Sequence, residues 1–193
     1  MYESVVALVN TVMIVVGSVR PGRIGLPIAE WVRLRVEETS DLTVDFVDLA
    51  ELALPFMDEP NHPILQQYTK QHTLDWAARV AAADAFIFVT PEYNHSFSPA
   101  LKNAIDFLNK EWWRKPYGVV SYGGVSAGTR GVTALEPIVS ALGLVRTGAF
   151  VELPFGGKQV VDGVFVAGDK ETTISGHMIA DLEKLAEGLK PLR

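Results

Sequence analysis

The sequence predicts an α/β fold of three layers, in which helices cover both faces of a parallel β-sheet. Five short runs rich in Val, Ile and Phe are mostly continuous rather than alternating, which is typical of strands buried on both faces. Helical patterns lie between these runs, and the spacing of successive runs is that of βα units. Because no repeat or linker divides the 193 residues, we expect a single domain over residues 1–193.

The predicted strands and helices alternate along the chain. The first, third and fourth strands read TVMIVVG, AFIFVT and YGVVSY, and are apolar almost throughout. The second and fifth, LTVDFVDL and LVRTGAFV, are also rich in Val and Phe. In order, the predicted strands cover Thr11–Gly17, Leu42–Leu49, Ala85–Thr90, Tyr117–Tyr122 and Leu144–Val151. The predicted helices cover Gly25–Glu38, Lys70–Ala83, Pro99–Asn109, Gly128–Leu142 and Glu171–Leu189.

The helix predicted at Pro99–Asn109 has clear local signals. Ser98 is a good N-cap residue, and Pro99 occupies the first helical position, where its missing N–H costs nothing. Apolar residues then recur at helical spacing and face the sheet: Leu101, Ala104, Ile105 and Leu108. The aromatic residues Phe107, Trp112 and Trp113 lie off this stripe and indicate either core packing or a contact between subunits.

Two segments are predicted to be irregular. Leu52–Thr69 is a long connection, and loops of that length in a compact domain are usually functional or mobile. Pro154–Lys170 is Gly-rich and indicates a hairpin or a flexible excursion.

The composition excludes several classes of function. Charged residues make up 21% and hydrophobic residues 48%, which is the globular range. The net charge of −6, without a Lys/Arg run, argues against general binding of nucleic acid or an anionic membrane. The absence of cysteine excludes disulfides and thiolate chemistry and is compatible with the cytoplasm, where we expect the protein. The four histidines, at positions 62, 72, 95 and 177, lack ligand spacing, so no metal site is predicted.

The apolar run Ser4–Val19 predicts neither a membrane span nor a signal peptide. It is too short for a spanning helix of about 20 residues and is broken by Asn10 and Thr11. Glu3 precedes it in place of the positive charge that a signal peptide carries.

The loop after the first strand is suited to an anion. Ser18-Val19-Arg20-Pro21-Gly22-Arg23-Ile24-Gly25 matches neither a Walker A loop nor GxGxxG. It nevertheless offers a hydroxyl, two guanidinium groups and the amides of a helix N-terminus, whose dipole favours negative charge. It therefore favours phosphate binding, although solvated arginines in an ordinary turn would have the same sequence.

The loops after the third and fourth strands can surround a flat ring. Pro91-Glu92-Tyr93-Asn94-His95 joins an aromatic face, amide groups and a rigid turn, and an ordinary strand-to-helix turn is the alternative. Ser121-Tyr122-Gly123-Gly124 lets backbone N–H groups approach a ligand closely. The segment from Gly124 to Gly128 also matches GxSxG, the nucleophile-elbow pattern, with Asp162 or Asp169 and then His177 in hydrolase order. A serine hydrolase that uses Ser126 is therefore a remote alternative.

Together these loops resemble those of the NADPH-dependent FMN reductase family. The resemblance rests on GSVRPGR at Gly17–Arg23, PEYN at Pro91–Asn94 with LKNAID at Leu101–Asp106, and SYGG at Ser121–Gly124. Many members carry Ser and Asn where this chain has Arg23, Ile24 and Gly25. The family includes quinone, azo-dye and chromate reductases. The resemblance implies a flavodoxin-like fold with strand order 2-1-3-4-5, bound FMN, NADPH or NADH as electron donor, and a homodimer or homotetramer.

The resemblance also implies the site residues. Ser18, Arg20, Arg23, Ile24 and Gly25 would hold the FMN phosphate. Flanking the isoalloxazine ring would be Pro91, Glu92, Tyr93, Asn94, Ser121, Tyr122, Gly123 and Gly124. Phe56, Met57 and His95 are weaker candidates for the acceptor pocket.

The predicted reaction is a hydride transfer from the nicotinamide to flavin N5, followed by electron transfer to a small-molecule acceptor. The acceptor would be a quinone, an azo compound, a flavin or a metal oxyanion. One shared stacking site implies ping-pong kinetics. Because flavin N5 carries the chemistry, no catalytic acid or base is predicted. The main alternative is a flavodoxin-like electron carrier that NAD(P)H does not reduce directly.

Overall fold

A computed structural model describes residues 10–193 and contains the predicted parallel sheet. Its strands are β1 (Thr11–Val16), β2 (Thr43–Asp48), β3 (Ala85–Pro91), β4 (Pro116–Gly123), β5 (Val145–Arg146) and β6 (Val151–Pro154). Neighbouring strands are parallel and follow the order β2-β1-β3-β4, with β5 and then β6 both paired to β4. The predicted order 2-1-3-4-5 and the flavodoxin-like fold are confirmed, with two short strands sharing the fifth position.

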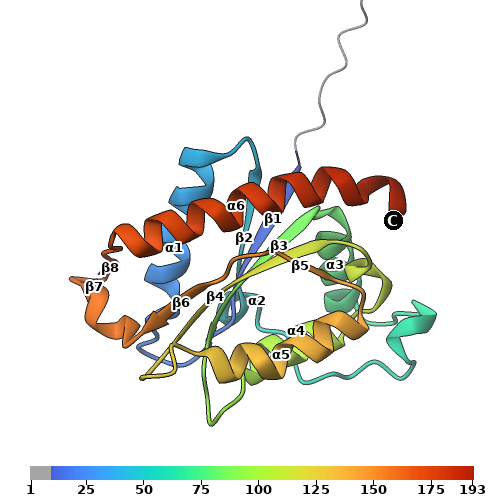
Figure 1. Ribbon diagram of the computed structural model, residues 1–193. Coiled ribbons are helices and arrows are strands. Elements are labelled where there is room, and N and C mark those ends of the chain that lie inside the picture. Colours follow the sequence, from blue (N-terminus) through green and yellow to red (C-terminus); the bar gives the residue numbers. More distant parts are fainter. Residues whose placement is uncertain (1–9) are drawn as a thin grey trace, which may run out of the picture.

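Helices cover both faces of this sheet (Figure 1). They are α1 (Gly25–Thr39), α2 (Leu49–Leu52), α3 (Gln71–Ala82), α4 (Pro99–Asp106), α5 (Thr129–Ala141) and α6 (Asp169–Leu189). α1 and α6 pack against one face, and their core includes Ile28, Val32 and Met178. α3, α4 and α5 pack against the other face, with Trp76, Leu101 and Leu135 in its core.

The predicted continuous fifth strand is wrong, because residues 147–150 leave the sheet between β5 and β6. The Thr147 hydroxyl donates a hydrogen bond to the carbonyl oxygen of Ala149, at 2.9 Å. This local contact bends the chain before it returns to pair with β4 at Val151.

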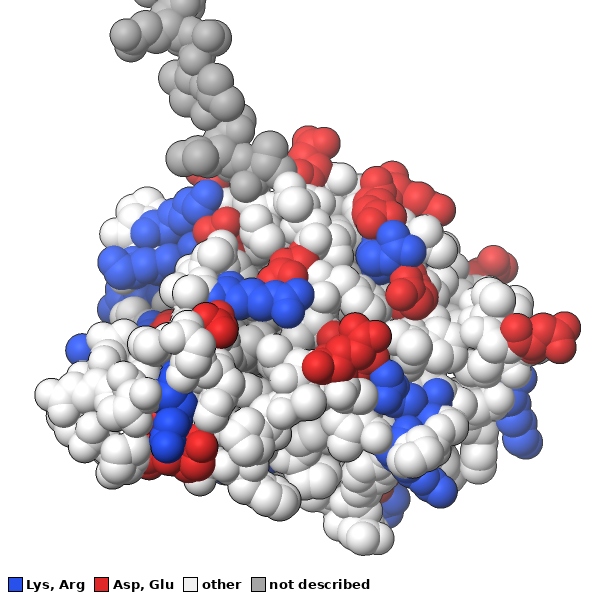
Figure 2. All heavy atoms as spheres, turned by 180° about the vertical axis from the view of Figure 1, so that it is seen from behind, with Lys and Arg blue, Asp and Glu red and all other residues white. Residues whose placement is uncertain are grey.

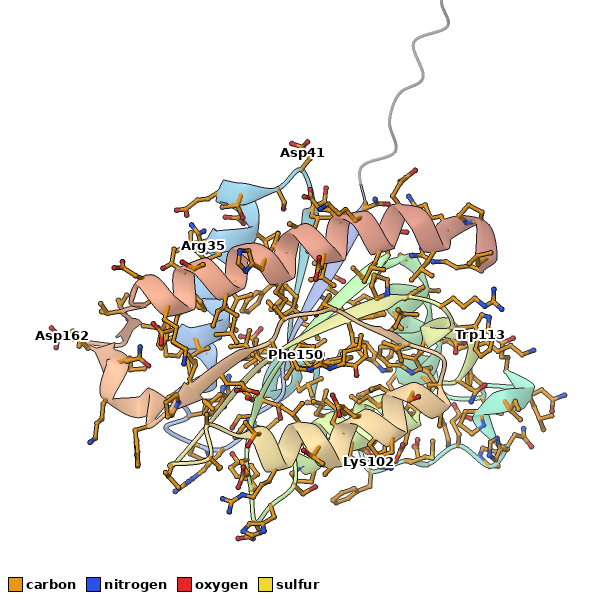
Figure 3. The ribbon with its side chains drawn as sticks, viewed as in Figure 1. Arg35, Asp41, Lys102, Trp113, Phe150 and Asp162 are labelled. Atoms are coloured by element: carbon orange, nitrogen blue, oxygen red, sulfur yellow. The ribbon has the colours of Figure 1, made fainter. Side chains whose placement is uncertain are left out.

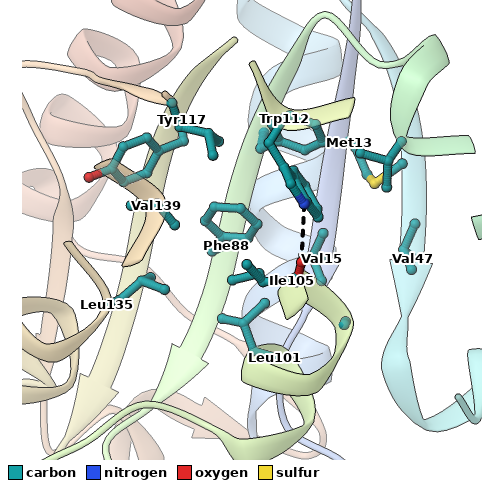
Figure 4. Packing of buried hydrophobic residues seen from close by; sticks show 14 of the residues in the cluster. Met13, Val15, Val47, Phe88, Leu101, Ile105, Trp112, Tyr117, Leu135 and Val139 are labelled. Atoms are coloured by element: carbon teal, nitrogen blue, oxygen red, sulfur yellow. Dashed lines mark hydrogen bonds between the residues drawn. The ribbon is translucent and has the colours of Figure 1, made fainter. Parts of the chain in front are cut away.

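The aromatic residues beyond α4 fall into two groups. Phe107 and Trp112 are fully buried in the core, and the Trp112 indole donates to the carbonyl oxygen of Ile105 at 3.2 Å (Figure 4). Core packing is therefore confirmed for these two, and they are unavailable as a subunit contact. Trp113 is half exposed and lies at the far end of the molecule from Asp162 (Figure 3).

Ser98 is the N-cap residue of α4 and Pro99 its first residue, as predicted, but the Ser98 hydroxyl does not bond to the first turn of the helix. Its side chain makes no capping bond, because its hydroxyl donates instead to the carbonyl oxygen of Gly17. α4 also ends at Asp106 rather than Asn109. The bond from Ser98 ties the start of α4 to the end of β1, where a ligand of this fold would bind.

Both irregular segments are well organised. In Leu52–Thr69, the Glu59 carboxylate accepts hydrogen bonds from the backbone of Thr69 and Lys70 just before α3. The segment after β6 contains a short 3-10 turn, Gly156–Gln159, and an antiparallel hairpin of β7 (Val160–Val161) and β8 (Val164–Phe165). The hairpin prediction is confirmed.

Residues 1–9 lie outside the described residues, and so does the first part of the apolar run Ser4–Val19. Within residues 10–193, no helix combines the length and the apolar character needed to cross a bilayer.

Candidate functional site

A pocket of about 360 Å³ opens at the carboxyl ends of β1, β3 and β4. This is the edge of the sheet at which ligands bind in open α/β folds, because the strand order reverses there. The structure brings together most of the predicted site residues around it. The lining residues are Ser18, Arg20, Pro21, Gly22, Arg23, Ile24, Pro91, Glu92, Tyr93, Tyr122 and Gly123.

The loop after β1 offers donors to an anion. The buried Ser18 hydroxyl lies 2.9 Å from the Tyr93 hydroxyl and joins this loop to the loop after β3. Arg20 is exposed, and within residues 10–193 it forms no ion pair. α1 begins at Gly25 without an acidic residue in its first turn, so the positive end of its dipole is not neutralised locally.

The structure gives Arg23 a carboxylate partner that sequence reasoning missed. Its guanidinium pairs with Asp48 at the carboxyl end of β2, and the other oxygen of Asp48 accepts the backbone N–H of Ala50 at 2.9 Å. The Nε atom of Arg23 is buried and has no partner within residues 10–193. The sequence shows Asp48 as a carboxylate at the end of an apolar strand. Only the three-dimensional structure shows that Arg23 is its partner.

The Tyr122 side chain lies against Gly25, where the loop after β1 leads into α1. Its hydroxyl is buried, and no group within residues 10–193 bonds to it. Burial raises the pKa of Tyr122 well above its ordinary value, so the phenol stays neutral. A Cβ atom on Gly25 would lie only 2.4 Å from the Tyr122 hydroxyl oxygen, so only glycine fits at the start of α1.

The loop after β3 forms a tight turn beside the pocket. Tyr93 and Ser96 exchange backbone hydrogen bonds of 2.8 and 3.0 Å. At the exposed tip between them, Asn94 and His95 adopt left-handed φ angles of 49° and 66°. The structure therefore places Pro91, Glu92 and Tyr93 on the pocket wall and Asn94 and His95 outside it.

Glu92 connects this loop to the loop after β4. Its side chain is only 5% exposed, and it accepts hydrogen bonds from the Ser126 hydroxyl at 2.8 Å and from Arg130 Nε at 2.6 Å. Although burial opposes its ionisation, the bonds from Arg130 and Ser126 lower the pKa of Glu92 below its ordinary value. Arg130 was missed by sequence reasoning, because it lies on a helix remote from Glu92 in sequence.

These contacts do not form the triad that the remote hydrolase alternative would require. In the described part of the chain, the recorded polar contacts of the Ser126 side chain are with Glu92 and Arg130. His177 is exposed on α6, which covers the opposite face of the sheet from α5 (Figure 1). A serine nucleophile needs a histidine within hydrogen-bond reach, so the geometry does not support hydrolysis at Ser126.

The glycine loop after β4 brings backbone close to the pocket. The buried Ser121 hydroxyl donates to the carbonyl oxygen of Ala127 at 2.9 Å and closes the loop. A Cβ on Gly123 would lie 2.9 Å from the backbone nitrogen of Gly128, so a side chain cannot fit there. Gly124 is exposed beside it and does not line the pocket.

Phe56 lines a different, largely apolar pocket of about 530 Å³ between the segment after β2 and α4, which reaches Val19. Asn103 fastens this wall, since its side chain donates to the carbonyl oxygen of Pro55 at 2.7 Å and accepts the N–H of Met57 at 3.1 Å. The two pockets therefore meet at the loop after β1. Phe56 and Met57 do not line the pocket that contains Tyr93. Asn103 is a further residue that sequence reasoning missed.

No metal site is apparent in residues 10–193, where no three His, Asp or Glu side chains come together. On the face in Figure 2, basic and acidic side chains form small separate groups divided by uncharged surface.

Comparisons with known proteins place these loops in a family. A family model described as NADPH-dependent FMN reductase matches residues 10–157. An NAD(P)H-dependent FMN reductase of Schizosaccharomyces pombe is 39% identical over 65% of this chain and 64% of its own length. One from Saccharomyces cerevisiae is 36% identical over 74% of this chain and 81% of its own length. The chain thus spans less than two thirds of the first of these relatives.

Solved structures are similar in fold. FerB from Paracoccus denitrificans, a flavoenzyme NAD(P)H:(acceptor) oxidoreductase, superposes with a TM-score of 0.76 at 21% identity, over 94% of this chain and 99% of that one. A flavodoxin from Streptococcus pneumoniae superposes with a TM-score of 0.59 at 16% identity, over 91% and 99% of the two chains.

Proposed function

The chain belongs to the NADPH-dependent FMN reductase family, and on this premise we propose that it is an oxidoreductase that uses FMN and NAD(P)H. The observation that carries the proposal is the pocket at the ends of β1, β3 and β4, where Arg20 forms no ion pair within residues 10–193 and the first turn of α1 has no acidic residue. When bound, FMN would accept a hydride at N5 and pass electrons on.

The residues present fit this group. The Ser18 hydroxyl, the Arg20 guanidinium and the first amides of α1 form a donor set for a phosphate. The buried Nε of Arg23, which lacks a protein partner within residues 10–193, is a further donor in the same loop. Gly123, which admits no side chain, leaves backbone amides free to face a planar ring. Ile24 also lines the pocket. Gly25 and Ser121 are buried next to the loops that form it, and Asn94 and Gly124 are exposed outside it, where we assign them only to its rim.

The pocket residues would act mainly by positioning the flat ring and by keeping uncompensated negative charge away from it. Pro91 and Tyr93 form a rigid wall that orients a flat ring and shields it from water. Arg130 neutralises Glu92, so this wall carries no uncompensated negative charge against a ring that collects electrons. We assign no protein group to proton transfer.

We further propose that the acceptor is a small planar oxidant, such as a quinone, an azo compound or a free flavin, or a metal oxyanion. It would use the position that the nicotinamide leaves, which implies ping-pong kinetics. The name of a relative from Staphylococcus haemolyticus, an FMN-dependent NADPH-azoreductase 31% identical over 74% of this chain and 72% of its own length, supports an azo compound among these. Cytoplasmic location and assembly into a homodimer or homotetramer stay predictions.

One absorption experiment tests the proposal. The protein is incubated with FMN, desalted and scanned before and after anaerobic addition of NADPH. We expect retained flavin absorbance that bleaches, and we expect Arg20→Ala to lose flavin on desalting while Arg35→Ala, farther along α1 and paired with Glu38, retains it. Retained colour that NADPH and NADH leave unchanged would indicate an electron carrier. Loss of all flavin from the wild type would contradict the assigned phosphate site.

A further inference from the structure

The segment after β6 lies against the candidate flavin pocket. The backbone N–H of Phe155 donates to the carbonyl oxygens of Gly123 and Gly124, at 2.9 and 3.2 Å. A Cβ on Gly157 would lie 3.7 Å from Cδ1 of Ile24, at the end of the phosphate loop. Figure 1 shows this orange segment beside the loops that follow β1 and β4. Residues 155–158 therefore form one rim of the pocket.

Phe155 has an unusual backbone conformation on this rim. Its φ of 52° lies in the left-handed region, which is costly for a bulky side chain. The residue is nevertheless 50% exposed, so burial of its side chain offsets little of that cost. A strained backbone conformation at an exposed aromatic residue points to a role in binding, because packing of the ring does not account for it.

Lys158 adds a positive charge to this aromatic face. Its Nζ lies 5.1 Å from the centroid of the Phe155 ring, and its backbone N–H donates to the Phe155 carbonyl oxygen at 2.8 Å. Across residues 10–193, no carboxylate lies within ion-pair distance of Lys158, whereas Arg23 and Arg130 are paired with Asp48 and Glu92. Lys158 and Arg20 are thus the cations near the pocket that remain available to ligands.

We propose that Phe155 and Lys158 form a subsite for the adenosine 2′-phosphate of NADPH, an assignment that rests on the proposed function. A pocket of about 360 Å³ is too small to hold both FMN and a whole nicotinamide dinucleotide, so the adenosine half must lie outside it, and the rim is an adjoining surface. In NADPH, adenine and the 2′-phosphate are attached to the same ribose. Adenine would stack on the Phe155 ring, and the 2′-phosphate would pair with the Lys158 ammonium group beside it. The pyrophosphate, which NADH also contains, matches this pair of residues less well, because no aromatic ring is attached directly beside it.

Steady-state reduction with each donor, together with nucleotide binding, tests the subsite. We expect Lys158→Ala to raise KM for NADPH about tenfold, as the loss of one charge-assisted contact would, with KM for NADH changed less than twofold and kcat retained. Lys184→Ala, an exposed lysine on α6, is the matched control and leaves both donors unchanged. By calorimetry, adenosine 2′,5′-bisphosphate should bind the wild type more tightly than AMP does, and Lys158→Ala should remove that preference.

Phe155→Leu should weaken the binding of NADPH and NADH by a similar factor, because it removes the stacking face and keeps the charge of Lys158. Equal changes in KM for NADPH and NADH in Lys158→Ala, or an unchanged preference in calorimetry, would overturn the subsite. If the wild type oxidised neither donor, the proposed function would fail, while the calorimetric comparison would still decide whether Lys158 binds the 2′-phosphate.

Discussion

Replacing Arg130 by alanine should destabilise the protein, because it leaves the Glu92 carboxylate without its charge partner. Glu92 is 5% exposed and Arg130 is 47% exposed, so the pair is intermediate between a surface and a buried ion pair. Surface pairs contribute about 0.2–1 kcal/mol, and breaking a buried pair costs about 3–5 kcal/mol. Since Ser126 still donates to the carboxylate, we expect a loss of about 1–2 kcal/mol.

The assay is urea unfolding of the FMN-free protein at pH 7, with a double-mutant cycle. Glu92→Gln should lower the free energy of unfolding by less than about 0.5 kcal/mol, because water then solvates the exposed Arg130 guanidinium. Adding Glu92→Gln to Arg130→Ala should restore more than half of the lost stability, because the uncompensated charge is gone. A double variant whose loss equals the sum of the single losses would refute the charge argument.

The pH dependence of the same variants has a defined sign. The pKa of Glu92 is lowered in the folded protein, so its ionisation stabilises the fold above its ordinary pKa of about 4.3 and ceases to do so as pH falls. Arg130→Ala should therefore lose less stability than the wild type between about pH 5 and pH 3. Parallel stability curves for the two proteins would contradict this assignment.

Three further predictions follow from other contacts. Gly25→Ala should destabilise by about 1–3 kcal/mol in thermal unfolding, because its Cβ would meet the Tyr122 hydroxyl oxygen at 2.4 Å, and adding Tyr122→Phe should recover part of the loss. Burial opposes ionisation of Glu59, but hydrogen bonds from Lys70 and Thr69 lower its pKa to about 2, so Glu59→Gln should accelerate limited proteolysis within Leu52–Thr69 at pH 7 and make little difference once the pH falls below about 2. Asn103→Ala should accelerate cleavage of the same segment and cost about 1–2 kcal/mol, with FMN retention unchanged; loss of flavin would show that the two pockets are coupled.

Much of the fold could be predicted from local patterns. Continuous apolar strands and helices of the right length define βα units, and the handedness of such units leaves few arrangements of the sheet. The loops at the ends of β1, β3 and β4 meet at one edge for the same reason, so Ser18, Tyr93 and Gly123 were expected together before any contact was known. The hairpin of Pro154–Lys170 was visible as well, because its glycines mark a turn.

Other features depend on residues that are distant in sequence. The burial of Phe107 and Trp112 follows from the packing of α3 and α4 on the sheet, where helical spacing had not placed them. The fifth strand looked continuous, but the Thr147 contact bends it, and that bend brings the chain back to β4 so that Phe155 reaches the glycine loop.

The sequence by itself determined the alternation of strands and helices, the kind of loop at the ends of the strands and the family resemblance, because these depend on periodicity and short motifs. The strand order was expected because the resemblance implied it. Only the tertiary structure decided which charges are compensated. Arg23 pairs with Asp48 and Arg130 with Glu92, while Arg20 and Lys158 pair with no carboxylate of residues 10–193. The physical reason is that an ion pair requires two charged groups to lie within about 4 Å, and their separation depends on where the fold directs each side chain.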